Sequence, residues 1–355
     1  MSIAFIIPTL GGGGAERVVS HLSLYHSRSH RVLVITWDGR DPAYTFGGEI
    51  VDLGLPALNA LIGKPWRQRQ RYKALVNVLA AHQVKQAIAF MESAGVILAM
   101  AKSRALPELR TTVSVRSSPL ALGRIARMQI RRWYPLVDRV VMQTSASVAQ
   151  ISKLGIPANR CTVVPNPLPT DWLQSVPMFA ERENGLILAV GRLDPVKEFN
   201  LLLTAFARLK TERLPSLVIL GEGPMRSVLM AQAQSLGIAD RVVFPGRVTD
   251  VRAWLDRARV FVMTSRNEGF PNALAEAMAR GCPVISTDCP TGPGEMIEHG
   301  RSGWLVPVGD AAALANAMTE ALLDAKCAET FGYRARLRAE EWAIDQIAPR
   351  WLEDV

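Results

Sequence analysis

The sequence has few cysteines, no long apolar stretch and few carboxylates in its first half. None of its four cysteines stands in a C-x-x-C or C-x-x-H pair, so a metal site or a disulfide framework is not expected and a reducing compartment is favoured. No stretch approaches the roughly 20 apolar residues that span a bilayer. The apolar start, residues 1–10, has no basic leader and is too short for a signal sequence. We therefore expect a cytoplasmic protein, soluble or peripheral.

Acidic residues are scarce in one half of the chain only. Residues 1–170 hold 21 Lys and Arg against 8 Asp and Glu, whereas residues 171–355 hold 20 against 24. The net charge of +9 therefore originates in the first half. This asymmetry predicts an anionic partner for that half, with a generic basic surface as the alternative.

Short apolar runs alternate with helix-like segments, a pattern typical of parallel sheets covered on both faces. The runs are residues 3–10, 30–37, 85–91, 111–115 and 138–144, and then 185–192, 215–223, 240–248, 260–265 and 282–287. The Pro-rich, aperiodic stretch 165–185 separates the two series. We predict an α/β fold of two Rossmann-like doubly wound domains that face a central cleft, residues 1–167 and 185–335, with a linker over residues 168–184.

Ligands in such sheets bind at the carboxyl ends of the strands. At the first strand end, four glycines (residues 11–14) precede a helix, and backbone N–H groups there attract anions. The third glycine position of a G-x-G-x-x-G fingerprint falls on Glu16 or Arg17, which excludes a dinucleotide site. A flexible loop is the alternative.

Charged residues follow two strands of the second half. Arg192 and Lys197 come just after one strand, where two cations can neutralise a diphosphate and stabilise it as a leaving group. Glu268 lies in a turn after another strand. Glu276 follows Asn272 by four residues and so shares its helical face. Taken singly, these side chains also fit a solvated surface.

Residues 122–135 (LGRIARMQIRRWYP) interleave arginines with apolar residues. A basic amphipathic helix of this kind suits an anionic lipid surface, while nucleic-acid binding and a solvated face are the alternatives. We favour the membrane surface and expect no nucleic-acid partner. The candidate membrane residues are Arg124, Arg127, Arg131, Arg132 and Trp133. Residues 64–73 add five cations.

These motifs together resemble glycosyltransferase family 4, retaining enzymes with the GT-B fold. The likeness covers nearly the whole chain and is densest from Gly191 to Asp310. Its specific signature is a Glu, seven residues and a second Glu, here Glu268 and Glu276, together with GRLDPVK, GEGP and CPVISTDCPTGP. The amphipathic tail, residues 336–355, resembles the family's C-terminal helix, which returns to the N-terminal domain.

The resemblance implies an acceptor-binding first domain and a nucleotide-sugar-binding second domain. Arg192 and Lys197 would hold the donor diphosphate, Glu268 would contact the donor sugar, and these three are the catalytic candidates. Glu276 would bind the ribose. The other donor-binding candidates are Gly13, Gly14, Glu222, Arg247, Val248, Gly269, Phe270, Pro271 and Asn272.

The chain departs from the family pattern at one place. Many members carry a His after the strand that corresponds to residues 111–115, where this chain has Arg116, Ser117 and Ser118. Arg116 and Ser117 are therefore candidates for contacting the sugar or the acceptor, and the general base is left open. The family implies no metal or other cofactor, and the sequence has no D-x-D pair to bridge a cation to diphosphate.

We therefore expect a retaining glycosyltransferase that moves a hexose or N-acetylhexosamine from a UDP-sugar to a polyprenyl-diphosphate-linked saccharide. It would work at the inner face of the cytoplasmic membrane, against an anionic lipid surface. The alternatives are a transferase acting on lipopolysaccharide core or a soluble acceptor, a sugar-nucleotide epimerase, and a non-catalytic nucleotide-sugar-binding protein. The sequence does not distinguish UDP from GDP donors.

Overall fold

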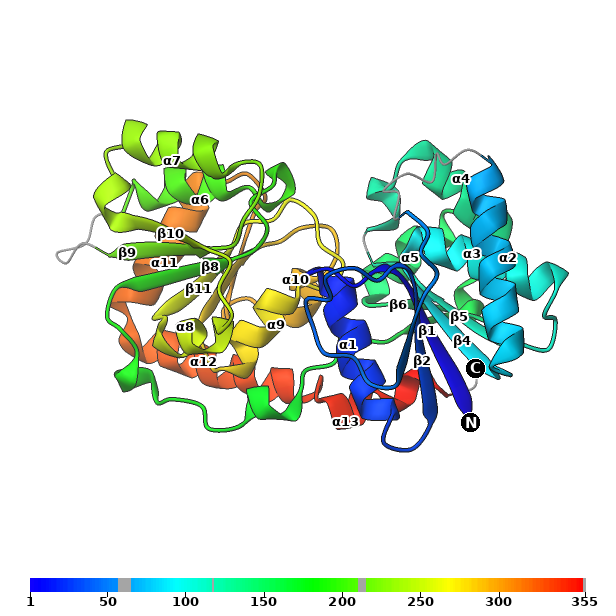
Figure 1. Ribbon diagram of the computed structural model, residues 1–355. Helices are drawn as coiled ribbons and strands as arrows, with labels where there is room; N and C mark the ends of the chain where they lie inside the picture. The colour runs from blue at the N-terminus through cyan, green and yellow to red at the C-terminus, as the bar shows by residue number, and fades with distance from the viewer. Residues whose placement is uncertain (57–64, 117, 210–214, 354–355) are drawn as a thin grey trace. The chain divides into compact units, whose positions relative to one another are not determined.

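The computed structural model describes residues 1–56, 65–116, 118–209 and 215–353. The chain divides into two compact units (Figure 1). The first comprises Met1–Pro167 and Ile344–Val355, and the second comprises Leu168–Ala343. Each unit is built on its own parallel β-sheet with helices packed against it, as the alternating apolar runs predicted.

In the described part of the first unit, seven parallel strands have the order β3-β2-β1-β4-β5-β6-β7. The strands are β1 (Ser2–Thr9), β2 (Arg31–Asp38), β3 (Glu49–Asp52), β4 (Gln86–Phe90), β5 (Arg110–Ser114), β6 (Arg139–Met142) and β7 (Cys161–Val163). The helices are α1 (Gly14–His26), α2 (Pro65–Ala81), α3 (Glu92–Arg104), α4 (Arg124–Trp133), α5 (Ser145–Ser152) and α13 (Ile344–Ile347).

The burial of strand β1 shows that this sheet is covered on both faces. Every residue from Ile3 to Ile7 is fully buried. Ala4 and Ile6 belong to a core shared with α2 and α3, whereas Phe5 belongs to a second core shared with α1. Because successive side chains of a strand point to opposite faces, a strand buried on both sides has a continuous apolar sequence.

The second unit has, among its described residues, six parallel strands in the order β10-β9-β8-β11-β12-β13. The strands are β8 (Leu186–Val190), β9 (Ser216–Leu220), β10 (Val242–Gly246), β11 (Val260–Met263), β12 (Val284–Thr287) and β13 (Trp304–Val306). The helices are α6 (Phe199–Phe206), α7 (Arg226–Ser235), α8 (Val251–Arg257), α9 (Asn272–Ala279), α10 (Pro293–Met296), α11 (Ala311–Leu323) and α12 (Ala325–Glu340).

Both sheets reverse their strand order once. In the first unit the reversal lies between β1 and β4, and in the second it lies between β8 and β11. At such a switch point the two connections leave in opposite directions and open a crevice at the carboxyl ends of the strands. The turns after β1, β8 and β11 are therefore the places where each unit can hold a ligand.

The end of the chain packs in the first unit. Trp351 is fully buried and stacks on Phe90 with the ring centroids 5.0 Å apart. The imidazole Nε2 of His26 lies 3.1 Å from the carbonyl oxygen of Ala348. The return of the tail to the first unit thus begins at Ile344, whereas the boundary expected at residue 336 falls inside α12, which packs against α9.

Residues 168–184, expected to form a linker, pack as part of the second unit. Arg280 has a fully buried side chain that donates to both Asp256 carboxylate oxygens, at 2.6 and 3.0 Å, and to the Trp172 carbonyl at 3.0 Å. The buried guanidinium of Arg182 in turn donates to the Arg280 carbonyl. Buried arginines therefore hold the backbone of this Pro-rich segment, and its short 3-10 turn Thr170–Leu173 also packs against α9 and α12.

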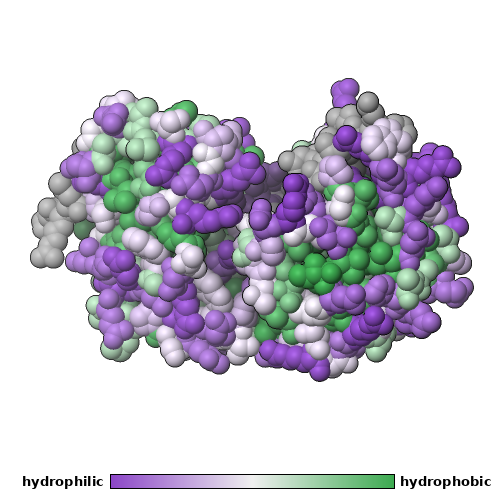
Figure 2. All heavy atoms as spheres, in the orientation of Figure 1, coloured by the Kyte–Doolittle hydropathy of each residue, from purple (hydrophilic) through white to green (hydrophobic). Residues whose placement is uncertain are grey.

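Hydrophilic residues are common on the face of each unit that Figure 2 shows, with apolar patches between them. Among the helices that the structure describes, none is long and apolar enough to cross a membrane.

We predict that Arg280→Met destabilises the second unit by about 3–5 kcal/mol, because removing one partner of a buried ion pair leaves the other uncompensated. Urea unfolding followed by circular dichroism measures the change, with the exposed Arg208→Met as the matched control. A loss of less than about 0.5 kcal/mol, the usual effect of a surface substitution, would contradict the role assigned to Arg280.

Candidate functional site

The switch point of the second sheet brings two charged turns together. Strand β8 pairs with β11, so the turn that carries Arg192 and Lys197 lies beside the turn that carries Glu268. The Lys197 ammonium Nζ lies 2.5 Å from Oε1 of Glu268. The same oxygen accepts a hydrogen bond of 2.6 Å from the Ser265 hydroxyl. The structure therefore places Lys197 and Glu268 in contact, with Arg192 on the same turn as Lys197, and these three residues are the charged cluster of the site.

The two cations of this cluster differ in their exposure. The Lys197 side chain is 26% exposed and its partner Glu268 is 12% exposed, so the ion pair is largely shielded from water. The Arg192 side chain is 73% exposed, and its Nε lies 3.9 Å from an Asp194 carboxylate oxygen. Arg192 is thus available to an incoming anion, while Lys197 is held by a carboxylate.

Hydrogen bonds to the backbone fix both turns. The Thr264 hydroxyl donates to the Lys197 carbonyl at 2.8 Å, and the Arg266 N–H donates to the Val196 carbonyl at 2.8 Å. The Thr291 hydroxyl donates to the Glu268 carbonyl. Neighbouring strand ends and the Thr291 side chain therefore fix the backbone that carries the charged side chains.

The Gly-rich turn after β9 packs against the turn after β8. Gly221 has a φ of +135°, and a Cβ there would lie 2.0 Å from the Gly191 carbonyl oxygen. A Cβ on Gly223 would lie 2.3 Å from the Leu193 carbonyl oxygen. Between these glycines, Glu222 accepts a 3.1 Å hydrogen bond from Arg226. The GEGP motif thus contains glycines because two backbones meet there.

The start of α9 carries four more of the predicted donor-binding residues. Gly269, Phe270 and Pro271 are buried, and the Phe270 ring packs edge-on against Trp342 with centroids 5.2 Å apart. Asn272 is half-buried. The tightly packed turn therefore presents its backbone, and not the Phe270 ring, to any ligand at the helix start.

The predicted ribose ligand, Glu276, lies on α9 and is buried, with 3% exposure. The alternative of an exposed helical carboxylate is therefore wrong.

Two other predicted donor-binding residues follow β10, where Arg247 is exposed and Val248 is half-buried. The structure thus leaves Arg247 accessible at a strand end.

In the first unit, the glycine turn lies beside a carboxylate that the sequence reasoning missed. Gly13 precedes α1, Gly14 begins it, and a Cβ on Gly13 would lie 2.2 Å from Oε2 of Glu16. Glu16 is buried and accepts a 2.9 Å hydrogen bond from the Thr9 hydroxyl. Burial raises the pKa of Glu16, which favours its neutral form.

Arg116 is committed to contacts within the first unit. One guanidinium nitrogen donates to Asn166 Oδ1 at 2.6 Å, and the group lies 5.6 Å from the Phe90 ring centroid. Burial lowers the pKa of Arg116 to about 10, although Glu92 and Glu16 favour its charged form. Asn166 and Glu92 were not predicted, and the only sequence signal is their position just after strands β7 and β4. Ser117, the other acceptor candidate, lies outside the described residues.

The predicted basic helix is confirmed as α4, with one correction. Ala126, Ile130 and Trp133 are its buried residues, so Trp133 is not available to a membrane surface. The Arg104 and Arg132 guanidinium groups lie 5.1 and 5.4 Å from its ring centroid. A cavity of about 480 Å³ is lined by Arg124, Arg127, Met128, Arg131, Arg132 and Leu154. Helical periodicity alone could not tell which apolar residues of α4 face the core.

The described residues contain no cluster of three or more His, Cys, Asp or Glu side chains that could hold a metal ion. Metal independence stays a prediction. It supposes that Arg192 and Lys197 supply the positive charge that a bound diphosphate requires.

Two family models match the chain. The model of Glycosyltransferase Family 4 matches residues 12–172, and that of Glycosyl transferases group 1 matches residues 177–338. The chain belongs to glycosyltransferase family 4. The resemblance drawn from the two glutamates and the glycine turns is thereby confirmed, and the protein is a glycosyltransferase.

Two relatives of this family-4 enzyme come from Campylobacter jejuni. One is the GalNAc-α-(1->4)-GalNAc-α-(1->3)-diNAcBac-PP-undecaprenol α-1,4-N-acetyl-D-galactosaminyltransferase, 28% identical over 99% of this chain and 98% of the relative. The other is N-acetylgalactosamine-N,N'-diacetylbacillosaminyl-diphospho-undecaprenol 4-α-N-acetylgalactosaminyltransferase, 27% identical over 97% of this chain and 96% of the relative. Both are similar over nearly their whole length.

Solved structures share the fold of this family-4 enzyme. Anabaena HepE in complex with UDP and glucose has a TM-score of 0.82 at 21% identity, covering 99% of this chain and 98% of that one. The lipopolysaccharide outer core galactosyltransferase WaaB has a TM-score of 0.77 at 21% identity, with the same coverage. The predicted GT-B fold of two parallel-sheet domains is confirmed. The individual roles assigned to the site residues stay predictions.

Proposed function

We propose that this glycosyltransferase moves a hexose or N-acetylhexosamine from a UDP-sugar, with retention, to a polyprenyl-diphosphate-linked saccharide. The observation that carries the proposal is the cluster of Arg192, Lys197 and Glu268 at the switch point of the second sheet. Two cations suit a diphosphate and the carboxylate suits sugar hydroxyls. HepE, a structural neighbour, is known in complex with UDP and with UDP-glucose, which supports a uridine donor.

In this proposal Lys197 changes its partner when the donor binds. A diphosphate carries more negative charge than the Glu268 carboxylate, and it draws the Lys197 ammonium and the exposed Arg192 guanidinium onto its oxygens. Glu268 keeps its hydrogen bond from Ser265 and accepts another from a hydroxyl of the donor sugar. The same two cations then stabilise the charge that develops on the departing diphosphate, and they take the place of a metal ion.

Retention follows if the acceptor attacks from the side that the diphosphate leaves. The bond between the anomeric carbon and the phosphate oxygen breaks, with its electron pair going to the diphosphate. The acceptor oxygen then bonds to the same face of that carbon and passes its proton to a phosphate oxygen. This route needs no side-chain base, which is consistent with Arg116 occupying the place of a histidine and being bound to Asn166.

Recognition of the nucleoside is assigned to residues around the same strand ends. Buried Glu276 would accept hydrogen bonds from the ribose hydroxyls. Arg247 and Val248, after β10, would flank the uracil, with Glu222 bordering the nucleotide.

The acceptor class rests on the first unit and on the relatives. Both Campylobacter relatives have undecaprenol linked through a diphosphate in their names. Helix α4 exposes Ile125 and Met128 beside its arginines, which suits a lipid surface with anionic headgroups. We therefore assign the enzyme to the inner face of the cytoplasmic membrane.

The proposal predicts that only one donor in a panel of UDP- and GDP-sugars releases its nucleotide, and that this nucleotide is UDP. Release should require a lipid-diphosphate saccharide as the acceptor. The rate of release should be the same with and without EDTA. Glu268→Gln should lower the transfer rate by about 100-fold or more, as loss of a group that contacts the transition state does. Nucleotide release measures the rate, and the exposed Glu108→Gln is the matched control.

Release that requires lipopolysaccharide core, the acceptor of WaaB, would replace the proposed acceptor class. Release from a GDP-sugar alone would replace the donor, and loss of release with EDTA would contradict metal independence. An unchanged rate for Glu268→Gln would contradict its contact with the sugar.

A second prediction concerns membrane binding. Changing Arg124, Arg127, Arg131 and Arg132 to Ser should release the protein from anionic vesicles, since each basic residue near such a surface contributes about 1 kcal/mol. Flotation with phosphatidylglycerol vesicles measures binding. The control carries the same charge change at the exposed residues Arg28, Lys85, Arg208 and Lys326. Equal binding of both variants would contradict the role of α4.

A further inference from the structure

Glu198, the residue after Lys197, has a backbone conformation that disfavours its side chain. Its φ is +47° and its ψ is +41°, in the left-handed region that Gly and Asn adopt most readily. The conformation reverses the chain between the short turn Pro195–Lys197 and helix α6, and the Leu201 N–H donates to the Glu198 carbonyl at 2.9 Å. A glycine would meet this requirement with less strain, so the backbone does not explain the carboxylate.

The Glu198 side chain is the buried member of an ion pair. It is 8% exposed, and its Oε1 accepts a hydrogen bond from the guanidinium of Arg266, whose side chain is 70% exposed. Within the described residues, Oε2 of Glu198 is buried and accepts no hydrogen bond. Both the unsatisfied buried oxygen and the left-handed backbone are unfavourable. Their coincidence at one residue beside a charged site indicates a functional constraint.

Arg266 connects Glu198 to the turn that carries Glu268. Arg266 lies two residues before Glu268, and Glu198 lies directly after Lys197. Two ion pairs of opposite orientation thus join the same two turns. In one the cation, Lys197, is on the turn after β8, and in the other the cation, Arg266, is on the turn after β11. The backbones are joined as well, because the Arg266 N–H donates to the Val196 carbonyl at 2.8 Å.

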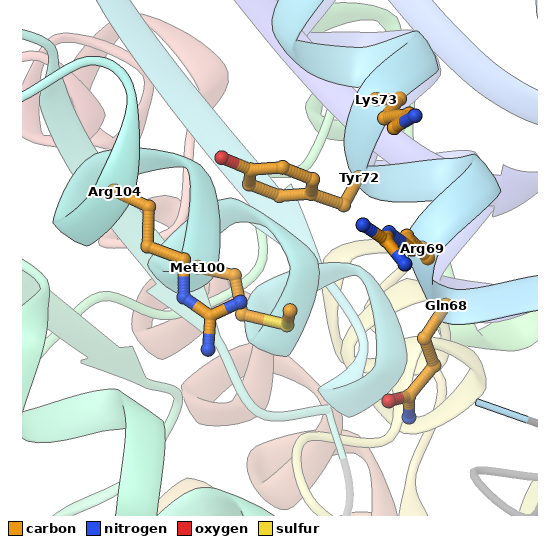
Figure 3. Close-up of a pocket in the computed structure, with 6 residues that line it drawn as sticks. All are labelled: Gln68, Arg69, Tyr72, Lys73, Met100 and Arg104. Carbon is orange, nitrogen blue, oxygen red and sulfur yellow. The ribbon is translucent and has the colours of Figure 1, made fainter. Parts of the chain in front are cut away.

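Arginines elsewhere on this protein are placed differently. Arg69 and Arg104 line a cavity between α2 and α3 of the first unit, and its described lining residues include no carboxylate (Figure 3). Arg301 pairs with Glu298, which lies three residues earlier in the sequence. The pair made by Arg266 instead joins residues 68 positions apart, so it fixes one part of the second unit against another.

We propose that Glu198 is a positioning residue for the transfer reaction. It acts through Arg266, and the pair keeps the lysine turn against the glutamate turn when the donor diphosphate draws Lys197 away from Glu268. The Glu268 carboxylate then stays where it can meet the donor sugar. The change of partner by Lys197 rests on the function proposed above, whereas the bridge between the two turns does not depend on that function.

Glu198→Gly tests the bridge, because glycine suits the left-handed backbone and removes the carboxylate. The urea unfolding midpoint should stay close to that of the parent, since relief of backbone strain offsets the loss of a partly exposed ion pair. In contrast, kcat should fall by about tenfold or more, as small displacements of catalytic groups cause. UDP affinity, measured by calorimetry, should stay that of the parent because Arg192 and Lys197 remain. Glu198→Asn also suits the backbone and should behave alike.

The partner is tested by Arg266→Gln, which should lower kcat as Glu198→Gly does. Arg266→Lys keeps the charge and should recover most of the rate. Combining Glu198→Gly with Arg266→Gln should lower kcat no further than either change alone, because both remove the same bridge. The matched control is Arg301→Gln, which removes a paired arginine of similar exposure, 71%, from the same unit and should leave kcat unchanged.

Three outcomes of these measurements would overturn the proposal. The first is an unchanged kcat for Glu198→Gly. The second is a double variant in which the two effects multiply. The third is a loss of kcat that only follows a loss of folded protein in both Glu198→Gly and Glu198→Asn, which would assign Glu198 to stability alone.

Hydrogen exchange of the Arg266 amide tests the bridge without turnover. The parent here is Lys197→Met, which lacks the other ion pair. Adding Glu198→Gly should speed exchange of this amide by about tenfold or more, since its bond to the Val196 carbonyl then opens more often. Equal exchange in both variants would overturn the bridge. If no donor gives turnover, the proposed function fails, and the exchange experiment still decides whether Glu198 joins the two turns.

Discussion

The ion pair between Lys197 and Glu268 is the contact on which the account of this enzyme depends. It exists because β8 and β11, which are far apart in sequence, are neighbours at the switch point of the second sheet. Hydrogen bonds from Thr264 and Ser265 hold the lysine turn and the carboxylate in place. Charges positioned before the ligand arrives need little reorganisation during the reaction, which is how such groups lower a barrier.

Arginine serves opposite purposes in different parts of this fold. Arg280 is buried, paired with Asp256 and bound to backbone carbonyls, so it stabilises the second unit and has no capacity left for a ligand. Arg192, whose side chain is 73% exposed, is instead accessible to a ligand. Partners and burial, and not residue type, therefore separate the structural arginines from those that can serve catalysis or binding.

The sequence predicted the long buried strands and the two strand-end turns of the site well. Continuous apolar runs such as residues 3–10 mark strands buried on both faces, and the glycines at Gly221 and Gly223 mark a close approach of two backbones. The edge strands β3, β7 and β13 were not predicted, because they have three or four residues and little burial pattern of their own.

The sequence did not predict the contacts between distant parts of the chain. The Arg280 side chain reaches the Trp172 carbonyl, 108 residues away, and so turns an apparent linker into part of a domain. Glu16 is close to its glycine turn in sequence, yet its burial depends on tertiary packing. The amphipathic pattern of α4 identified a helix but not the burial of Trp133, because periodicity does not show which stripe is covered.

The central claim is that Lys197 leaves Glu268 for the donor diphosphate. Calorimetric titration of UDP into Lys197→Met and Glu268→Gln tests it most directly. The account predicts opposite effects, since loss of Lys197 removes a diphosphate ligand and should weaken UDP binding by about tenfold or more. Loss of the Glu268 charge frees the ammonium and should leave UDP binding equal or tighter. Weakening of UDP binding by both variants alike, or by neither, would contradict the claim.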